Sequence, residues 1–340
     1  MNIERLHDIA NRMVAPGKGI LAADESTGSI TKRFESIKLE STETNRRDYR
    51  EMLFRAADAM RSCVSGVILF DETLRQKAAD GTPLVDVIKA AGAVPGIKLD
   101  KGPKPLPFCP GETVTEGLDG LADRVAEYAK LGAEFAKWRA VIDVSDTIPS
   151  FNAIHANAHA LARYAAICQA GGIVPMVEPE VLMDGAHDID RCAEATEWAL
   201  KETFQQLYHA RVALEGIILK PNMVIAGKKC PRQASRAEVA EKTLKVLKRC
   251  VPAAVPGIAF LSGGQSGEDA TAHLHLMNAA GPLPWKLTFS YGRALQADAL
   301  KAWGGKMENV AAGQRAFAHR ARMNALAASG RWSQDAEKAA

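Results

Sequence analysis

The sequence predicts one α/β domain, a closed (β/α)8 TIM barrel that starts with a helix and continues into a helical C-terminal extension. Two observations support this fold. Eight short apolar runs recur along the 340 residues, and most of them are separated by stretches with helical periodicity. This alternation is typical of parallel strands joined by crossover helices, and eight such strands close a barrel. We expect a single domain over residues 1–340, with the barrel core at about 17–304 and the extension at about 305–340.

The predicted strands are apolar runs bounded by glycine, proline or a charged residue. A run that stays apolar until its last position indicates a strand covered on both faces, as in a parallel sheet surrounded by helices. The eight runs lie at 19–24, 64–71, 94–100, 135–143, 173–180, 216–220, 257–262 and 285–290.

The segments between these strands carry apolar residues at helical spacing, at 49–60, 118–128, 154–168 and 239–250. Ser235 and Glu238 form a capping box that opens the last of these helices, and Gly171-Gly172 ends the third. The segments 102–111 and 223–232 contain proline and glycine and predict long loops after strands three and six. Loops at this rim are expected to touch a ligand.

After strand eight, 294–304 and the alanine- and arginine-rich stretch 307–329 predict two helices. The residues from Gly330 onward are small and polar. We therefore expect a loose tail there rather than an ordered element.

The composition is that of a globular protein with a substantial core. Hydrophobic residues make up 47% and charged residues 24%, which excludes disorder for most of the chain. The formal net charge is +3 and the basic residues lie among acidic ones, so no nucleic-acid partner is expected. The start lacks a signal-peptide pattern and no run of about 18 apolar residues occurs, so we expect no membrane partner.

The six cysteines show no C-x-x-C pair and no regular spacing. We therefore expect reduced thiols, a cytoplasmic location, and neither a zinc site nor a disulfide framework. His155 and His159 have the i, i+4 spacing of metal ligands on a helix, but no glutamate follows His155 as H-E-x-x-H requires. We interpret both as helix surface and expect no metal.

A lysine stands at the end of the sixth predicted strand, and Pro221 follows it. Proline cannot continue the ladder, so Lys220 lies at the carboxyl end of the strand, where parallel barrels hold their chemistry. A lysine partly removed from water at such a place is a usable nucleophile. A lone lysine at a strand end more often has a structural role, so a catalytic role requires suitable charged neighbours.

Charged residues on two neighbouring strands supply these neighbours. Alternate side chains of a strand share a face, so Lys137 and Arg139 lie together on strand four, and Glu178 and Glu180 on strand five. A second lysine raises the electrostatic cost of a protonated amine, and a carboxylate beside the two can shuttle protons. Imine chemistry requires such a set, and the catalytic candidates are Lys220, Lys137, Glu178 and Glu180.

Two further strands end in charge at the same rim. Asp24 and Glu25 follow strand one, and Lys98, Asp100 and Lys101 lie at the end of strand three. Each of these residues alone is more simply explained as a structural ion pair. Five strands that end in charge at one rim are harder to explain by packing, and Asp24 places a carboxylate on this rim beside strand eight.

Glycine-bearing loops follow strands seven and eight, where barrels commonly bind phosphate. Glycine lets backbone N–H groups approach an anion, and a helix N-terminus or an arginine completes the site. Because both loops fall at the expected positions, we predict an anionic ligand rather than two tight turns. The candidates are Ser262, Gly263, Gly264, Tyr291, Gly292 and Arg293.

Six short motifs follow one another along the chain: LAADES at 21–26, FAKWR at 135–139, VEPE at 177–180, LKPNM at 219–223, LSGGQS at 261–266 and SYGR at 290–293. In this order and spacing they resemble the motifs of class I fructose-bisphosphate aldolases. The resemblance runs from Ile9 to Trp303.

The resemblance implies that Lys220 forms a Schiff base with dihydroxyacetone phosphate or with the open-chain ketose. Glu178 matches the family's general acid/base, Lys137 the cation that assists it, and Asp24 the carboxylate that takes the C4 hydroxyl proton. No metal or cofactor is then needed, because the protonated imine withdraws electrons from C3. The implied phosphate positions are Ser262, Gly263, Gly292 and Arg293 for the C1 phosphate, and Ser26, Ser29, Lys98 and Arg139 for the C6 phosphate.

We therefore expect reversible cleavage of fructose 1,6-bisphosphate to dihydroxyacetone phosphate and glyceraldehyde 3-phosphate, by the homotetramer that the resemblance implies. Another Schiff-base lyase, such as a transaldolase, and a catalytically silent scaffold with the same fold are the alternatives. The chain departs from vertebrate members in having no tyrosine after Tyr291. Either the chain is truncated, or another group or water replaces the C-terminal tyrosine that assists proton transfer at C3 in those proteins.

Overall fold

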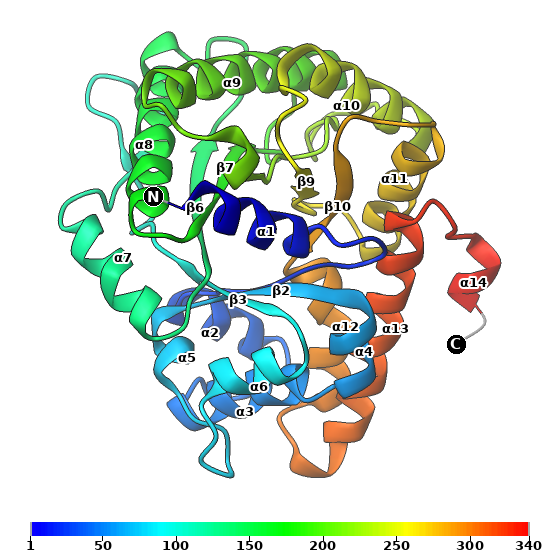
Figure 1. Ribbon diagram of the computed structural model, residues 1–340. Helices are drawn as coiled ribbons and strands as arrows, with labels where there is room; N and C mark the ends of the chain where they lie inside the picture. Colours follow the sequence, from blue (N-terminus) through cyan, green and yellow to red (C-terminus); the bar gives the residue numbers. More distant parts are fainter. Residues whose placement is uncertain (1, 339–340) are drawn as a thin grey trace.

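The barrel predicted from the sequence is present in the computed structural model, which describes residues 2–338. Eight parallel strands close in the order β1-β10-β9-β8-β7-β6-β3-β2, and helices surround them (Figure 1). The strands are β1 (Gly19–Ala23), β2 (Val64–Leu69), β3 (Val94–Lys98), β6 (Phe135–Ile142), β7 (Val174–Val181), β8 (Ile218–Leu219), β9 (Gly257–Phe260) and β10 (Lys286–Tyr291). Each strand lies within one of the predicted runs or ends one residue beyond it, so the fold prediction is confirmed.

Helix α1 (Ile3–Met13) lies across the N-terminal end of the barrel (Figure 1). Its buried residues Leu6, Ile9 and Met13 belong to one apolar cluster with interior residues of the strands, among them Phe135 and Ile218. Apolar side chains therefore fill this end of the barrel, and the polar groups gather at the opposite, carboxyl end.

The interior positions of a strand change from apolar to charged towards its carboxyl end. On β6 the interior residue Phe135 is followed two positions later by Lys137, and on β7 Met176 is followed by Glu178. Trp138, on the other face of β6, belongs to the outer apolar cluster between strands and helices. The period of two along each strand thus directs the charged side chains into one end of the barrel.

Most of the predicted helices are present near their predicted positions, and further helices occur between them. Ser235 Oγ accepts a hydrogen bond from Glu238 N at 3.2 Å and opens α10, and Gly172 adopts a φ of +77° just after α8. The predicted helix over 49–60 is instead two helices, broken at Arg55 and Ala56, so that the second one packs against α13. The helices are α2 (Thr27–Glu35), α3 (Glu43–Phe54), α4 (Ala57–Cys63), α5 (Asp71–Arg75), α6 (Leu84–Ala90), α7 (Leu121–Lys130), α8 (Phe151–Ala170), α9 (Ile189–His209), α10 (Arg236–Cys250), α11 (Gly267–Ala279), α12 (Arg293–Trp303) and α13 (Val310–Ala328).

The two predicted loops behave differently. The segment 102–111 contains strand β4 (Pro103–Pro105), which pairs antiparallel with β5 (Thr113–Thr115), so a small hairpin replaces part of that loop. The segment 223–232 has no helix or strand, as predicted. Among residues 2–338 no helix combines the length and the apolar character that crossing a membrane requires.

The residues after Gly330 correct the prediction of a loose tail. Trp332 is buried, and Gln334–Lys338 form helix α14, which lies beside α11 and α13 (Figure 1). Glu337 forms an ion pair with Arg320 of α13 and accepts a hydrogen bond from Trp332. Small polar residues are typical of a loose tail, but the buried Trp332 and the paired Glu337 hold this segment against the barrel. Residues 339 and 340 lie outside the described part of the chain.

Candidate active site

Four charged side chains from four strand ends meet at the carboxyl end of the barrel. Lys137 Nζ lies 2.7 Å from Asp24 Oδ2 and 3.2 Å from Glu178 Oε2. Lys220 Nζ lies 3.0 Å from Glu178 Oε1. The exposed fraction of each side chain is 12% or less. The structure thus joins four of the five residues predicted as catalytic into one continuous chain of ion pairs, which we call the quartet.

The backbone around Lys220 is fixed on both sides. Its N–H donates to the carbonyl of Val177 at 2.8 Å, which continues the ladder with β7 after β8 ends. On the other side the carbonyl of Pro221 accepts a hydrogen bond from Leu261 N at 3.1 Å. Because Pro221 has no N–H, the strand stops here, as predicted. Lys220 therefore extends from a rigid strand end into the barrel.

Asp24 is a carboxylate in this environment. Burial opposes its charge, but the Lys137, Lys220 and Lys98 cations outweigh burial and lower the pKa of Asp24 to about 2. An ionised carboxylate beside a reacting group can accept a proton from it.

Lys137 is held as an ammonium ion. Burial disfavours its charge, but Asp24, Glu178 and Asp100 outweigh burial and raise the pKa of Lys137 well above its ordinary value. A protonated amine has no free electron pair, so Lys137 can act as a fixed cation but not as a nucleophile.

Two more ion pairs lie at the ends of β3, β6 and β7. Arg139 pairs with Glu180, so this glutamate, a predicted catalytic candidate, lies outside the quartet and holds a cation at the rim. Lys98 Nζ lies 2.7 Å from Asp100 Oδ1 and donates to the carbonyl of the same residue at 2.6 Å. The cations predicted for the C6 phosphate are therefore present at the rim, each with a carboxylate partner.

A cavity of about 740 Å³ lies at the loops after β9 and β10. Ser262, Gly263 and Gly264 line it from the first loop and Arg293 from the second, and Ser29 of α2 lines it as well. Helix α12 begins at Arg293, so its N-terminus also lies at this cavity. Unpaired N–H groups at a helix N-terminus and a nearby arginine favour an anion. The predicted phosphate loops therefore lie on one cavity, together with a serine expected at the other phosphate.

Three further cations line this cavity, and the sequence pattern did not indicate them: Lys32, Arg33 and Lys301. Basic residues in the last turn of a helix normally compensate the helix dipole, and Lys32 and Arg33 fit that common role. The available signal was their position three and four residues after Ser29, which places all three side chains on one face of α2.

Arg33 is held in place by a buried network. Its Nη1 donates to Glu25 Oε1 at 2.5 Å, and the same oxygen accepts a hydrogen bond from Gln296 Nε2 at 3.1 Å. Gln296 Nε2 also donates to the carbonyl of Ala22 at 2.6 Å, and Arg50 Nη2 donates to the carbonyl of Glu25 at 2.7 Å. This network fixes α12 and Arg33 against the end of β1, next to Asp24.

The remaining predicted positions differ in their surroundings. A methyl group on Gly292 would lie 3.4 Å from Arg33 Nη2, so this glycine is near the cavity. Ser26 Oγ lies 3.1 Å from Ser29 Oγ. Tyr291 is fully buried and donates its hydroxyl to the carbonyl of Ala270 at 2.9 Å, so the structure does not bring its side chain into the cavity.

Within residues 2–338, no cluster of three or more histidine, cysteine, aspartate or glutamate side chains could hold a metal ion. His155 Nδ1 lies 2.8 Å from Glu202 Oε1, and its side chain is 45% exposed. His159 is exposed on the same helix, so both histidines are surface residues, as predicted.

The comparisons with known proteins agree with each other. Residues 5–340 match the family model described as fructose-bisphosphate aldolase class-I. The chain is 57% identical to a protein of Xanthomonas axonopodis pv. citri named probable fructose-bisphosphate aldolase class 1, over 98% of this chain and 99% of that one. It is 56% identical to fructose-bisphosphate aldolase C of Carassius auratus, over 96% of this chain and 90% of that one.

A solved structure is also close in shape. Fructose-bisphosphate aldolase from Plasmodium falciparum, in a co-crystal with TRAP and a small-molecule inhibitor, superposes with a TM-score of 0.96 at 49% identity. The match covers 97% of this chain and 96% of that one. A barrel that places Asp24, Lys137, Glu178 and Lys220 in contact, together with similarity over nearly the whole sequence, leads to one assignment: the chain belongs to the class I fructose-bisphosphate aldolase family.

Proposed function

We propose that this protein cleaves fructose 1,6-bisphosphate reversibly to dihydroxyacetone phosphate and glyceraldehyde 3-phosphate, through a Schiff base on Lys220 and without a metal ion. The observation that supports this most directly is the position of Glu178, whose two oxygens contact Lys220 and Lys137. A buried amine beside a carboxylate that can donate and accept protons has the groups that imine formation requires.

In the first half of the reaction, Lys220 transfers a proton to Glu178, and the resulting neutral amine adds to the C2 carbonyl of the open-chain ketose. Glu178 gives a proton to the departing hydroxyl, which leaves as water, and the protonated imine remains. Lys137 stabilises the carboxylate that this step leaves behind. Lys220 is therefore the nucleophile, Glu178 the general acid/base and Lys137 the fixed cation.

In the second half, Asp24 accepts the proton of the C4 hydroxyl while the electrons of the C3–C4 bond move into the imine. Glyceraldehyde 3-phosphate leaves, C3 takes up a proton, and water hydrolyses the imine to release dihydroxyacetone phosphate and the free amine. The low pKa of Asp24 agrees with a residue that is unprotonated when the substrate binds.

The phosphates fix the sugar over the lysine. For the C1 phosphate we propose Ser262, Gly263, Gly292 and Arg293, with Arg33 as an additional cation on the same cavity. For the C6 phosphate we propose Ser26, Ser29, Lys98 and Arg139. Two anchored ends hold the reacting bond in one position, which lowers the entropic part of the barrier.

Borohydride reduction in the presence of dihydroxyacetone phosphate tests this function, because it converts an imine into a stable amine. Peptide mapping should find the label on Lys220. A Lys229→Arg variant, which changes an exposed lysine on the following loop, should be labelled equally. A label on any other lysine would exclude the proposed mechanism, and equal turnover of sugars that lack one phosphate would favour a transaldolase-like lyase.

We also propose that the protein acts in the cytoplasm, in glycolysis and gluconeogenesis, as a single-domain homotetramer. Membership of the family supports the pathway and the assembly. The cysteines in residues 2–338 are all free thiols, which agrees with a reducing compartment. Sedimentation of the purified protein tests the tetramer, and a monomer or dimer at working concentration would exclude it.

A further inference from the structure

The segment 332–338, which we call the C-terminal latch, is bound to the barrel through a buried arginine. Arg320 of α13 is 5% exposed and forms a two-fold contact with Glu337, with Nη2 and Oε2 2.9 Å apart. Trp332 Nε1 donates to the same Oε2 at 2.9 Å, and its side chain is buried. One carboxylate thus neutralises a buried cation and also binds the indole of the latch.

The other side of Arg320 faces the start of α11. Its Nη2 donates to Thr271 Oγ1 at 3.1 Å, and the Thr271 hydroxyl lies 2.7 Å from the carbonyl of Gly267. A methyl group on Gly267 would lie 3.0 Å from the carbonyl oxygen of Ala294 in α12 and 3.3 Å from Arg320 Cδ. Helices α11, α12 and the arginine therefore meet with little space between them.

Both helices begin directly after the loops that line the phosphate cavity. The loop 262–266 leads into Gly267, the first residue of α11, and Gly292 leads into Arg293, the first residue of α12. The latch also contacts α11 itself, since Gln334 Nε2 donates to Glu268 Oε1 at 3.1 Å. The position of Arg320 is therefore linked to the backbone of both loops.

We propose that Arg320 is a positioning residue for the two phosphate-binding loops, and that the C-terminal latch keeps it in place. A buried guanidinium without its carboxylate moves towards water, because an uncompensated buried charge is costly. It would then leave Thr271 and the start of α11, and the loops would hold a phosphate less tightly. The proposal rests on the proposed function, which assigns phosphate binding to these loops.

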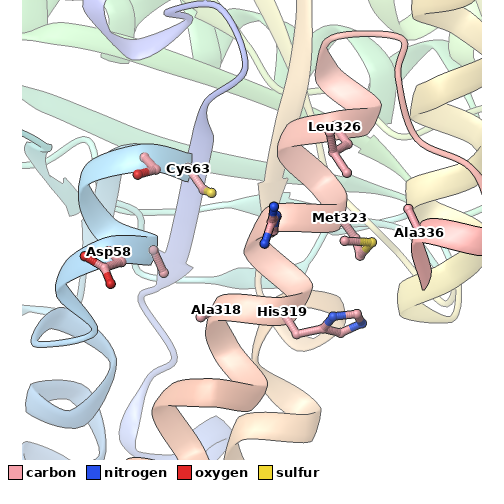
Figure 2. A pocket seen from close by; sticks show the side chains of 10 residues that line it. Asp58, Cys63, Ala318, His319, Met323, Leu326 and Ala336 are labelled. Carbon is pink, nitrogen blue, oxygen red and sulfur yellow. The ribbon is translucent and has the colours of Figure 1, made fainter. Parts of the chain in front are cut away.

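The latch borders a cavity on one side. A cavity of about 620 Å³ lies between α4, α13 and α14, and His319, Cys63 and Ala336 are among the residues that line it (Figure 2). His319 Nε2 is 3.6 Å from Glu337 Oε1. Ala336 borders this cavity, whereas Trp332 belongs to the main apolar cluster, so movement of the whole latch also removes the apolar contacts of its indole ring.

Two variants test the proposal with the full-length protein. Glu337→Gln keeps the shape of the side chain and removes its charge, and Trp332→Phe removes the indole N–H. Asp335→Asn, at an exposed position of the same helix, is the matched control. Each protein is trapped with borohydride over a range of dihydroxyacetone phosphate concentrations and, separately, with dihydroxyacetone, which has no phosphate. Binding of inorganic phosphate is measured by calorimetry.

The proposal predicts that half-saturation by dihydroxyacetone phosphate and the Kd of inorganic phosphate rise about three- to tenfold in both variants, because coupling through packed contacts has this size. Half-saturation by dihydroxyacetone and the maximal extent of trapping should equal those of Asp335→Asn. Unchanged phosphate binding in both variants would overturn the proposal, as would an equal loss for the two substrates that follows a loss of thermal stability. Failure to label Lys220 in the unmodified protein would overturn the proposed function instead. Phosphate calorimetry of the variants would still test whether Arg320 positions the two loops.

Discussion

Glu178 contacts two lysines at once, with Oε1 3.0 Å from Lys220 Nζ and Oε2 3.2 Å from Lys137 Nζ. One oxygen can therefore exchange a proton at Lys220 while the other stays paired with a permanent cation. Because Lys137 is also paired with Asp24, the two carboxylates proposed to transfer protons share one positive charge. This arrangement leads to separate predictions for the two carboxylates.

Replacing Glu178 should slow the formation and hydrolysis of the imine. A Glu178→Gln variant keeps the size of the side chain but cannot transfer a proton, so we expect a loss of roughly 10²- to 10⁴-fold in both steps. Single-turnover trapping with borohydride measures the first step. Glu194→Gln, at a side chain that is 69% exposed, is the control and should behave as the unmodified protein does. An unchanged rate of trapping in Glu178→Gln would remove this residue from the mechanism.

Replacing Asp24 should block cleavage after the imine has formed. In an Asp24→Asn variant the C4 hydroxyl has no base, so fructose 1,6-bisphosphate should remain bound to Lys220 as a six-carbon adduct. Borohydride reduction followed by mass spectrometry distinguishes this adduct from the three-carbon one. Rapid appearance of the three-carbon adduct in Asp24→Asn would assign the proton transfer to another group.

The loop after β9 should tolerate no side chain at Gly264. Its φ is +73°, and a methyl group there would lie 2.6 Å from Lys228 Cε and from Met183 Cγ. We expect Gly264→Ala to raise KM for phosphorylated substrates and to lower stability by about 1 kcal/mol or more. Gly28→Ala is the control, because nothing lies within 4 Å of its added methyl group and its φ is not positive. Equal KM values for the two variants would contradict a role of this loop's conformation in the binding of phosphorylated substrates.

Stability should fall as the pH decreases from about 6.5 to about 4, and His273 should contribute to this slope. Burial lowers the pKa of His273 to about 4, and its Nδ1 lies 2.6 Å from Gln265 Oε1 in the loop after β9. The unfolded chain takes up a proton near the ordinary histidine pKa, whereas the folded chain takes it up only near pH 4. Between these values the unfolded state binds more protons, which destabilises the fold by at most about 1.4 kcal/mol per pH unit for one group.

Urea unfolding of the unmodified protein and of His273→Gln over this pH range measures that contribution. The variant should show a flatter dependence between pH 6.5 and pH 4, while His209→Gln, which changes an exposed histidine at the end of α9, should keep the slope. Parallel slopes for the unmodified protein and His273→Gln would show that this histidine is not the group that titrates.

Activity should be unaffected by a chelator. In a Schiff-base mechanism the protonated imine at Lys220 withdraws the electrons that a metal ion would otherwise stabilise. The measurement is the initial rate of fructose 1,6-bisphosphate cleavage before and after prolonged dialysis against a strong chelator. A loss of activity that zinc restores would exclude the mechanism.

The quartet was predictable because each of its members lies at a strand end. The period of two assigns Lys137 and Glu178 to the interior, and the order of strands in a barrel brings Lys220 next to them. The same rule applied to β10 would have placed Tyr291 correctly. Tyr291 lies two positions after Phe289, so both side chains point out of the barrel, and both belong to the outer apolar cluster. The alternation of side chains along the strand therefore predicts the position of Tyr291 better than its place next to a glycine loop does.

The supporting contacts could not be predicted, because they join residues far apart in the sequence. The hydrogen bond between Gln296 and Glu25 spans 271 positions, and no local pattern in either segment indicates it. The latch was missed for the same reason. Glu337 holds the latch in place because it forms an ion pair with Arg320 of α13. The spacing of apolar residues within one helix does not indicate which distant residue will pair with it.

Closure of the barrel has a consequence for protein synthesis. β1 pairs with β10, with Ile20 beside Ser290, so the first strand stays without its second neighbour until almost the entire chain has left the ribosome. A prematurely terminated product that lacks β10 would carry Lys220 but could neither close the barrel nor form the cavity at the loops after β9 and β10. Only chains translated beyond β10 can therefore form the closed barrel.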